Sequence, residues 1–364
     1  MIKKKHFLAT LLATMALSTS AVQAGDCYSS CNPCDTDSCF GGFEIGADFL
    51  YWKMCMDDLD YAVKYTTEFS LDGDPAFEQV GCYQSICNDW KPGFRVYLAK
   101  ENIMCDWGLL LSYTWMKNCT STSSAVEVDG VGLLQPTLGI LNNNLSPTSD
   151  VLLDDYGVNF VGATYDITYQ SFDVLFASDY CFKQCHSFKP YFGVTGVFLD
   201  QTFDSAWVKE EGEASSGLTN WSDDFSGYGL KFGGEYSFDI CDGLSLFANA
   251  SGSITVGTHT AHFYQEKTVD SLTSLPDVIS SASLCEDECT FVSGYHIGVG
   301  FQYDSCMCDL EYALRVGYEF LEWRNVPNQR RFFSSELENF ANGSSPTIAT
   351  LGFHGLLAGL TLSF

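Results

Sequence analysis

Long runs of alternating apolar and polar residues constrain the fold of this chain more than any other feature. In YGLKFGGEYSF, one face of a strand carries Tyr228, Leu230 and Phe232, and the other carries Lys231 and Glu235. LEYALRVGYEF, FVSGYHIGVGFQY and the terminal LLAGLTLSF repeat this period of two. Such runs approach the roughly 9–11 residues of a tilted membrane strand, whereas strands in soluble sheets average about 5–6 residues. The runs therefore predict strands that cross a membrane.

The start of the chain carries an export signal. A basic head, Lys3 to His6, precedes the apolar run Phe7–Leu17, and the small residues of VQA predict cleavage after Ala24. Beyond it no apolar run approaches the 18 or so residues of a membrane helix, although 15% of the residues are aromatic. We expect residues 1–24 to be a signal peptide, 25–41 a Cys-rich periplasmic N-terminal segment and 42–364 a transmembrane barrel.

The connections between the predicted strands alternate in length. We expect strands at about 43–55, 91–101, 106–117, 160–178, 189–203, 225–239, 243–260, 290–304, 308–323 and 348–364. Every second connection is short, and the others are long and polar, the rhythm of short periplasmic turns and long extracellular loops. The sequence predicts an all-β, antiparallel up-and-down transmembrane β-barrel of about 10–12 strands, closed by pairing of the last strand with Phe43–Trp52. LDYAVKYTTEF could extend the first strand or form its own, and 120–155 could hold further strands.

Several segments together carry a family resemblance. GADFLYWKMCMDDLDYAV, KPGFRVYLAKENIMCDWGLLLSYTWM, SFDVLFASDYCFKQCHSFKPYFGVTGVFLDQTF, GLSLFANASGSITVG and LRVGYEFLEWRNVPNQ, in this order, resemble the Legionella-type major outer-membrane protein family. Many proteins of chlamydia-related bacteria are similar to this family. The resemblance implies a pore-forming barrel in the bacterial outer membrane, and it carries over no catalytic residue. Resemblance to outer-membrane proteins that end in phenylalanine implies that Phe364 is an assembly signal read by the barrel assembly machinery.

Polar residues on the strands give the candidate site. If the apolar faces meet lipid, the following side chains face the lumen: Arg95, Lys231, Glu235, Asn249, His296, Gln302, Glu311, Arg315 and Glu319. Two interpretations remain open for them. They form salt bridges that fill a narrow barrel, or they form a constriction that selects ions.

The charge balance excludes some partners and favours others. Removal of the three signal-peptide lysines takes the net charge from −28 to −31. Binding of nucleic acid through a basic patch is therefore excluded from the expected functions. Acidic clusters in the expected loops, such as Glu210–Glu211 and Glu286–Asp287–Glu288, would attract cations to a pore mouth or simply keep the loops soluble.

The chain has 16 cysteines, which in an exported protein indicate disulfides. Ten are expected on the periplasmic side: Cys27, Cys31, Cys34, Cys39, Cys105, Cys181, Cys185, Cys241, Cys306 and Cys308. Six are expected in outer loops or strand tops: Cys55, Cys82, Cys87, Cys119, Cys285 and Cys289. Cys82 with Cys87, and Cys285 with Cys289, are close enough in sequence for local bridges. The CNPC segment could alternatively be a redox motif or part of a zinc site, but no βαβ pattern surrounds it.

No catalytic pattern stands out, so we expect no enzyme, no cofactor and no metal. HExxH, GxSxG and P-loop motifs are absent from the sequence. An outer-membrane protease is the remaining enzymatic alternative, because His259, His262, Asp223 and Asp224 would lie near the outer rim.

The sequence thus predicts a porin-like protein for passive diffusion of small hydrophilic solutes, with a preference for cations. The alternative is a structural envelope protein or adhesin, with a plugged barrel and disulfide crosslinks. Expected partners are outer-membrane lipid, the assembly machinery, copies of itself or other envelope proteins through disulfides, and a host surface.

Overall fold

The computed structural model describes residues 42–68, 78–104, 107–125, 132–138, 158–182, 185–209, 215–241, 243–270, 276–307, 310–333 and 343–364. The expected signal peptide and the Cys-rich segment 25–41 lie outside these ranges. Every regular element in them is a β-strand. Within the same ranges, no helix is long and apolar enough to cross a membrane.

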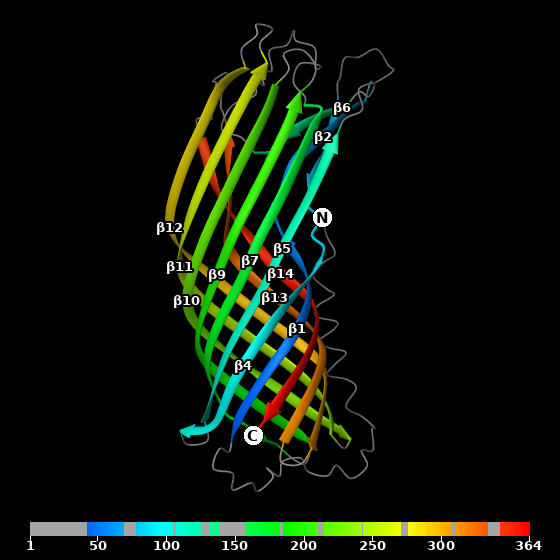
Figure 1. Cartoon of the computed structure of the whole chain (residues 1–364), viewed down its shortest axis with the longest axis vertical. Coiled ribbons are helices and arrows are strands. Elements are labelled where there is room, and N and C mark those ends of the chain that lie inside the picture. The colour runs from blue at the N-terminus through cyan, green and yellow to red at the C-terminus, as the bar shows by residue number, and fades with distance from the viewer. Residues whose placement is uncertain are drawn as a thin grey trace.

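Ten antiparallel strands form one closed barrel (Figure 1). They are β1 (Phe43–Met56), β4 (Trp90–Met104), β5 (Trp107–Ala125), β7 (Phe160–Ala177), β9 (His186–Lys209), β10 (Ser215–Cys241), β11 (Leu244–Asp270), β12 (Pro276–Met307), β13 (Leu310–Phe333) and β14 (Gly343–Ser363). Each strand pairs with its neighbours in this order, and β1 with β14 closes the ring. The all-β barrel and its ten predicted strand regions are confirmed.

The first strand pairs with the last strand along nearly all of its own length. The register runs from Glu44 opposite Ser363 to Met56 opposite Leu351. The backbone N–H of Phe364 adds a bond of 2.9 Å to the carbonyl oxygen of Phe43. From Leu351 to its end, the terminal strand therefore has no free edge on this side, which removes a site where an exposed strand would aggregate.

Several strands extend further towards the outer end than the sequence predicted. We define the outer end as the one opposite the start of β1 and the end of β14. β10 begins at Ser215 rather than near 225, and β12 begins at Pro276 rather than near 290. The outward face of these extensions carries side chains such as Asn220, Ser222 and Asp287 in place of apolar ones. In these outer extensions the strands stay paired, but their sequences no longer alternate between apolar and polar residues.

A smaller sheet stands at the outer end beside the barrel mouth. It orders β3 (Glu78–Ser85), β2 (Asp60–Glu68) and β6 (Gly132–Pro136), all antiparallel. The tract LDYAVKYTTEF is thus a strand of its own, and part of 120–155 does hold a short strand. The two-residue β8 (Tyr180–Cys181) pairs with β9 at the opposite, periplasmic end.

The two faces of the wall differ as the alternation requires. Outward residues form an apolar belt, with Phe49, Leu230 and Val316 being 56%, 64% and 61% exposed. Their neighbours in sequence point inward and are shielded. Outside a membrane such a belt would be a large exposed apolar surface, so it marks the height at which lipid surrounds the barrel.

Candidate functional site

The barrel interior is the candidate site, and all nine predicted lumen residues are on the inward face of their strands. Arg95, Lys231, Glu235, Asn249, His296, Gln302, Arg315 and Glu319 are shielded to varying degrees, whereas Glu311 is exposed near the periplasmic end. Eight of them make hydrogen bonds or ion pairs with inward side chains, which form a polar layer in the periplasmic half of the lumen.

Glu319 on β13 is the centre of this layer and is only 4% exposed. Arg95 of β4 approaches it in a forked arrangement, with Nη2 lying 3.2 Å from both carboxylate oxygens. His296 Nε2 lies 2.8 Å from Oε2, and Trp52 Nε1 donates to Oε1 at 3.1 Å. Arg95 also bonds to Asp48 Oδ2 at 3.3 Å. The buried charges are therefore paired and hydrogen-bonded, as a low-dielectric interior demands.

A second group surrounds Arg315. Its guanidinium forms an ion pair with Glu235 of β10 and donates from Nε to Gln302 Oε1 at 2.6 Å. The same group lies 4.7 Å from the centre of the Phe247 ring. The pair with Glu235 joins strands three steps apart in the sheet, so the contact crosses the lumen. Glu311 and Glu319, four residues away on the same strand, are about 13 Å distant along it.

A third group is built on Asp173 of β7. Lys231 Nζ lies 2.7 Å from Oδ2, Thr195 donates to Oδ1 at 2.6 Å, and Ser112 donates to Oδ2 at 3.2 Å. Asn249 accepts a bond of 3.1 Å from the Tyr191 hydroxyl. Every strongly buried charge of this layer thus has an opposite charge beside it.

A small cavity of about 50 Å³ remains inside the polar layer. Its lining includes Asp48, Arg95, Asn249, His296 and Glu319. One oxygen of Asp48, Oδ1, is buried without a hydrogen-bond partner among the protein atoms described. A polar cavity of this size has room for one or two water molecules.

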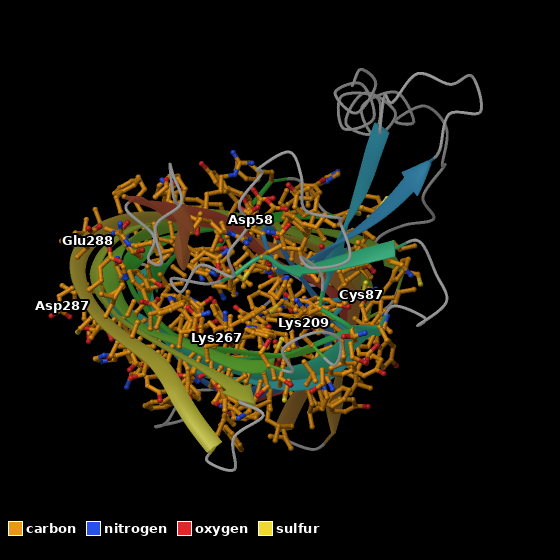
Figure 2. All side chains as sticks on the ribbon, turned by 90° about the horizontal axis from the view of Figure 1, so that it is seen from above. Asp58, Cys87, Lys209, Lys267, Asp287 and Glu288 are labelled. Atoms are coloured by element: carbon orange, nitrogen blue, oxygen red, sulfur yellow. The ribbon has the colours of Figure 1, made fainter. Side chains whose placement is uncertain are left out.

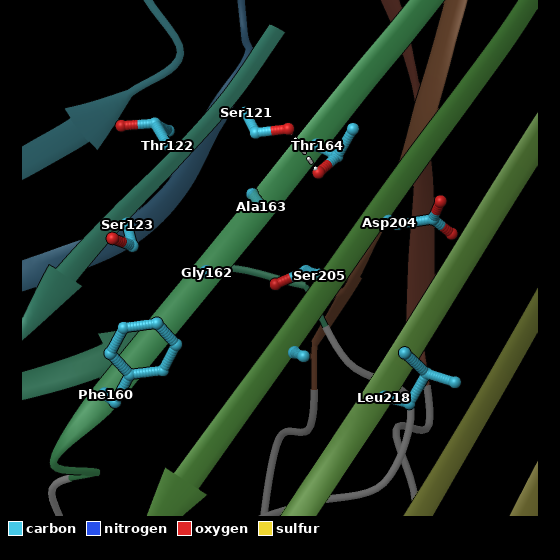
Figure 3. Close-up of a pocket in the computed structure, with 11 residues that line it drawn as sticks. Ser121, Thr122, Ser123, Phe160, Gly162, Ala163, Thr164, Asp204, Ser205 and Leu218 are labelled. Carbon is cyan, nitrogen blue, oxygen red and sulfur yellow. Dashed lines mark hydrogen bonds between the residues drawn. The ribbon is translucent and has the colours of Figure 1, made fainter.

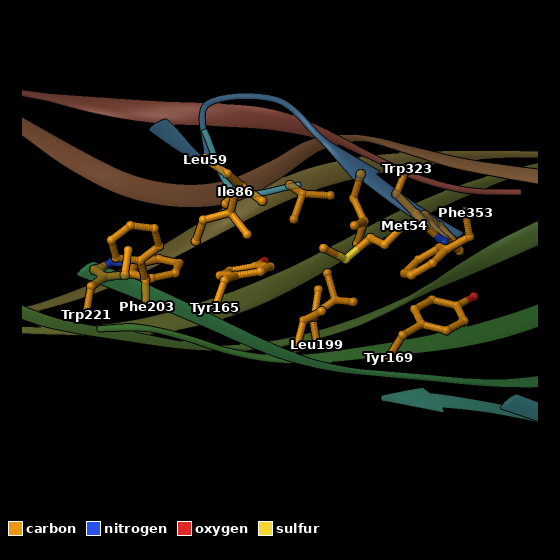
Figure 4. Close-up of a cluster of buried hydrophobic side chains, with 14 of the residues drawn as sticks. Met54, Leu59, Ile86, Tyr165, Tyr169, Leu199, Phe203, Trp221, Trp323 and Phe353 are labelled. Carbon is orange, nitrogen blue, oxygen red and sulfur yellow. The ribbon is translucent and has the colours of Figure 1, made fainter. Parts of the chain in front are cut away.

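An apolar layer fills the lumen on the outer side of the charges (Figure 4). Its largest fully buried side chains are Trp52, Trp221, Tyr165, Tyr169, Phe203, Phe225, Phe353, Leu50, Met54, Leu59, Met116 and Leu134. Most come from the barrel wall, while Leu59 and Leu134 come from the smaller sheet and the turn before it. Seen from above, side chains occupy the interior of the ring of strands (Figure 2).

Side chains from opposite walls meet in this apolar layer. The Tyr169 ring of β7 lies 6.4 Å from Trp323 of β13 and 5.1 Å from Phe353 of β14. β7 and β13 are five steps apart in a ring of ten, so this contact spans the barrel. Nearer the mouth, Gln201 of β9 donates to the Pro327 carbonyl at 3.3 Å. Side chains from opposite walls are therefore in direct contact across the lumen at these points.

Sequence reasoning missed several residues of the site. Asp48 and Asp173 were each visible as a lone carboxylate inside an aromatic strand, in GADFLYW and SFDVLFA. That isolation is a usable signal, because an unpaired charge in such a strand must face the lumen. Trp52 and Tyr169 gave no signal, since both faces of their strands carry large apolar side chains.

The outer cysteines do not form the expected local bridges. Cys55, Cys82, Cys87, Cys119, Cys285 and Cys289 are exposed free thiols. Cys285 and Cys289 lie in one continuous strand, β12, where four residues span about 13 Å. A disulfide needs Cα atoms within about 7 Å, so the predicted bridge between this pair is wrong. Cys82 lies within β3, and Cys87 follows that strand.

The described periplasmic cysteines lie at the short turns. Cys181 is in β8, Cys241 ends β10, and Cys306 is near the end of β12. Cys185, between β8 and β9, is disulfide-bonded. Cys27, Cys31, Cys34, Cys39, Cys105 and Cys308 also lie outside them.

Only two of the four histidine and aspartate residues of the protease alternative are brought together. His259 and Asp223 face inward, and His259 Nδ1 lies 2.9 Å from Asp223 Oδ1. His262 and Asp224 are exposed on the other side of the wall, because neighbouring positions of a strand alternate. The hydrogen bond to Asp223 raises the pKa of His259, and burial raises the pKa of Asp223. In the described ranges no set of three or more His, Cys, Asp or Glu side chains is arranged to hold a metal ion.

A separate hollow of about 380 Å³ opens on the outward face of the wall (Figure 3). It lies over the outer ends of β5, β7, β9 and β10, and Phe160, Thr164, Asp204 and Leu218 are among its lining residues. The lumen and this hollow are on opposite faces of the wall, so the hollow is no entrance to the polar layer.

The closed ring of long strands, its apolar belt and its paired interior charges define an integral β-barrel protein of the bacterial outer membrane. A family model described as "Legionella pneumophila major outer membrane protein precursor" matches residues 32–364. The chain belongs to this family. Among curated proteins, no relative matches it.

Solved structures with some likeness to the chain are outer-membrane barrels. The outer membrane protease OmpT from Escherichia coli is 8% identical, covers 90% of this chain and 98% of its own, and has a TM-score of 0.39. A Pseudomonas aeruginosa FadL homologue is 10% identical, with coverages of 88% and 89% and a TM-score of 0.23. The Pseudomonas putida toluene transporter TodX is 6% identical, with coverages of 88% and 89% and a TM-score of 0.27.

Proposed function

We propose that this protein is a closed outer-membrane barrel whose role is structural and directed to the cell surface. The observation that carries the proposal is the contact of Tyr169 with Trp323 and Phe353 across the lumen. A hydrated solute would have to displace this layer or lose its own water inside it. Transfer of a polar group into apolar surroundings without hydrogen bonds costs about 2–7 kcal/mol, and a charge costs more.

The polar layer supports the same proposal. Arg95, Lys231 and Arg315 are each held by at least one carboxylate, so their charges are already neutralised by protein groups. Pairing of this kind joins strands that are not neighbours in the sheet. These ion pairs fix the cross-section of the barrel. They also leave little net electrostatic field that could select mobile ions. We therefore favour salt bridges that fill the barrel over a selectivity constriction.

A narrow diffusion pore that prefers cations is the second candidate. It is supported by the water-sized cavity beside Asp48 and Glu319 and by the excess of acidic residues in the chain. In this candidate the apolar layer shifts to admit small solutes, and acidic loops concentrate cations at the mouth. Screening would weaken the preference, since the Debye length falls from about 10 Å at 0.1 M salt to about 3 Å at 1 M.

The proposal includes partners but no catalysis. Lipid covers the apolar belt, and the assembly machinery reads the terminal strand with Phe364. The periplasmic cysteines join the barrel to copies of itself or to other envelope proteins, and the outer loops contact a host surface. His259 and Asp223 are assigned to the stability of the outer end.

Efflux of small sugars and of potassium from liposomes tests the proposal. We expect wild-type protein to release neither solute above the rate of empty liposomes. Tyr169→Ala with Phe353→Ala removes two rings from the cross-lumen contact and should create a leak. Phe49→Ala with Phe320→Ala is the matched control, because it removes two rings from the lipid-facing side. Rapid efflux from wild-type liposomes would overturn the closed barrel and favour the pore.

A further inference from the structure

The outer end of β13 separates from β12. The two strands pair from Met307 opposite Leu310 to Ser293 opposite Arg324. Both then continue outward, β12 to Pro276 and β13 to Phe333, yet no further pair joins them among the residues described. A seam therefore divides the outer end of the wall, and among the described residues one edge of β12 has no partner strand there.

The segment Asn325–Arg331, called here the inward segment, folds into the barrel mouth. Asn325 has a φ of 62°, and the register with β14 shifts there and again between Asn328 and Arg331. The four residues Val326 to Gln329 are all buried. A strand within the wall would bury only every second one. Pro327 has no N–H for a ladder, which suits an edge strand.

Specific contacts hold the inward segment in the mouth. Gln201 donates to the Pro327 carbonyl at 3.3 Å, and Asn328 donates to the Asp57 carbonyl at 3.4 Å. Two ion pairs follow: Arg330 with Glu286 of β12, and Arg331 with Asp60 of the smaller sheet, at 2.5 Å. These contacts join the segment to β9, to β12, to the smaller sheet and to the turn after β1.

The inward position also carries a cost. The Gln329 side chain is 1% exposed, and neither its Nε2 nor its Oε1 has a hydrogen-bond partner in the described structure. A buried amide without partners destabilises the state that buries it. The contacts that hold the segment are therefore opposed by a group that would gain hydrogen bonds on exposure to water.

The sequence of the segment matches the free edge of β12. If the existing register simply continued beyond Ser293 and Arg324, Arg330 would lie opposite Asp287 and Arg331 opposite Glu286. Opposite charges facing each other across two strands stabilise their pairing. Asp287 lies at the rim of the barrel, on the strand that borders the seam (Figure 2).

We propose that the inward segment is a latch with two positions. In one position, seen here, it lies in the outer mouth and leaves the seam open. In the other it pairs with β12 in the continued register, which closes the seam and clears the mouth. This second position goes beyond the closed barrel proposed above, which requires only the first.

A disulfide trap tests the latch directly. In the continued register, position 328 lies opposite Cys289, an exposed free thiol, and both point outward. Opposite residues of antiparallel strands have Cα atoms about 4.5–5.5 Å apart, within the range for a disulfide. Asn328→Cys in the full-length protein, in lipid vesicles with the thiol oxidant diamide, should therefore crosslink to Cys289. Peptide mass spectrometry identifies the bond among the other cysteines.

Two matched substitutions, each of which removes one negative charge, distinguish the two positions of the latch. Asp60→Asn weakens only the inward position and should raise the crosslinking rate about threefold, the scale of one partly exposed ion pair. Asp287→Asn weakens only the paired position and should lower it by a similar factor. Glu288→Cys with Gln329→Cys is a second trap in the same register, for use if Asn328→Cys does not fold.

The outcomes are distinct. A folded barrel in which neither trap crosslinks, or crosslinking that ignores both neutralisations, would overturn the latch. Conductance of the trapped protein is read separately. A crosslinked latch without conductance leaves the latch intact and rejects the pore candidate, whereas conductance on trapping supports both.

Discussion

Removal of the charge on Glu319 should expose the strength of the cross-lumen pairing. Glu319→Gln keeps the side-chain shape but leaves the Arg95 guanidinium with Asp48 as its remaining carboxylate. Breaking a buried ion pair by changing one partner costs about 3–5 kcal/mol. Because Asp48 still compensates part of the charge, we expect a loss of about 2–4 kcal/mol in the free energy of unfolding. Urea unfolding in lipid vesicles, followed by tryptophan fluorescence, measures this loss.

A double-mutant cycle separates pairing from packing. Arg95→Met alone leaves Glu319 with His296 and Trp52 and should cost a similar amount. Arg95→Met with Glu319→Gln removes both charges, so we expect a loss smaller than the sum by about 2 kcal/mol. Glu311→Gln, at an exposed position of the same strand, is the control and should change stability by less than about 0.5 kcal/mol. Additive losses would refute the pairing argument.

The remaining predictions concern the ends of the barrel and its thiols. Deletion of Phe364 should leave export intact but lower the fraction of protein with the heat-modifiable gel mobility of a folded barrel; an unchanged fraction would reject the assembly signal. Thiol reagents that cannot cross the membrane should label Cys119 and Cys289 on intact cells, and labelling only after lysis would reverse the assigned orientation. Non-reducing gels, with thiols blocked before lysis, should give high-mass species that Cys→Ser changes at Cys27, Cys31, Cys34 and Cys39 dissolve; a monomer alone would reject crosslinking. His259 has a folded-state pKa above its unfolded value of about 6.5, so its stabilising contribution is full below that pH and is lost as pH rises through the folded pKa. His259→Gln should therefore cost more stability at about pH 5.5 than at about pH 8.5, and equal losses at both would contradict this.

The fold could be predicted because the side chains of a barrel strand in a membrane must alternate strictly between the lipid-facing and the lumen-facing side. Leu230 and Lys231 cannot exchange faces without placing a charge in lipid, which fixes the phase of β10 and the pairing of its neighbours. The closure of Phe43–Trp52 against the terminal strand was predicted for another reason, because the edge of a terminal strand needs a partner. The outer extensions escaped prediction because water on the outward face removes the need for apolar residues there, as at Asn220 and Ser222.

The contents of the lumen were only half predictable. Alternation assigns Arg95 and Glu319 to the inward face, but it does not say which strands they bridge, because those contacts depend on the curvature and tilt of the ring. The apolar layer was invisible for a different reason. Trp52 lies beside Tyr51, and a strand with large apolar residues on both faces gives no sign of which face meets lipid. The inward segment of β13 breaks the alternation altogether, so a periodic reading placed it with the loops.

Conductance of the purified wild-type protein in a planar bilayer tests the closed lumen most directly. With Tyr169, Trp323 and Phe353 in contact across the barrel, we predict a baseline without a steady open level at either polarity. The protein with Tyr169→Ala and Phe353→Ala should show small steps under the same conditions. A steady, ohmic conductance from the wild-type protein would contradict the closed lumen, and its reversal potential in a salt gradient would then decide whether the pore prefers cations.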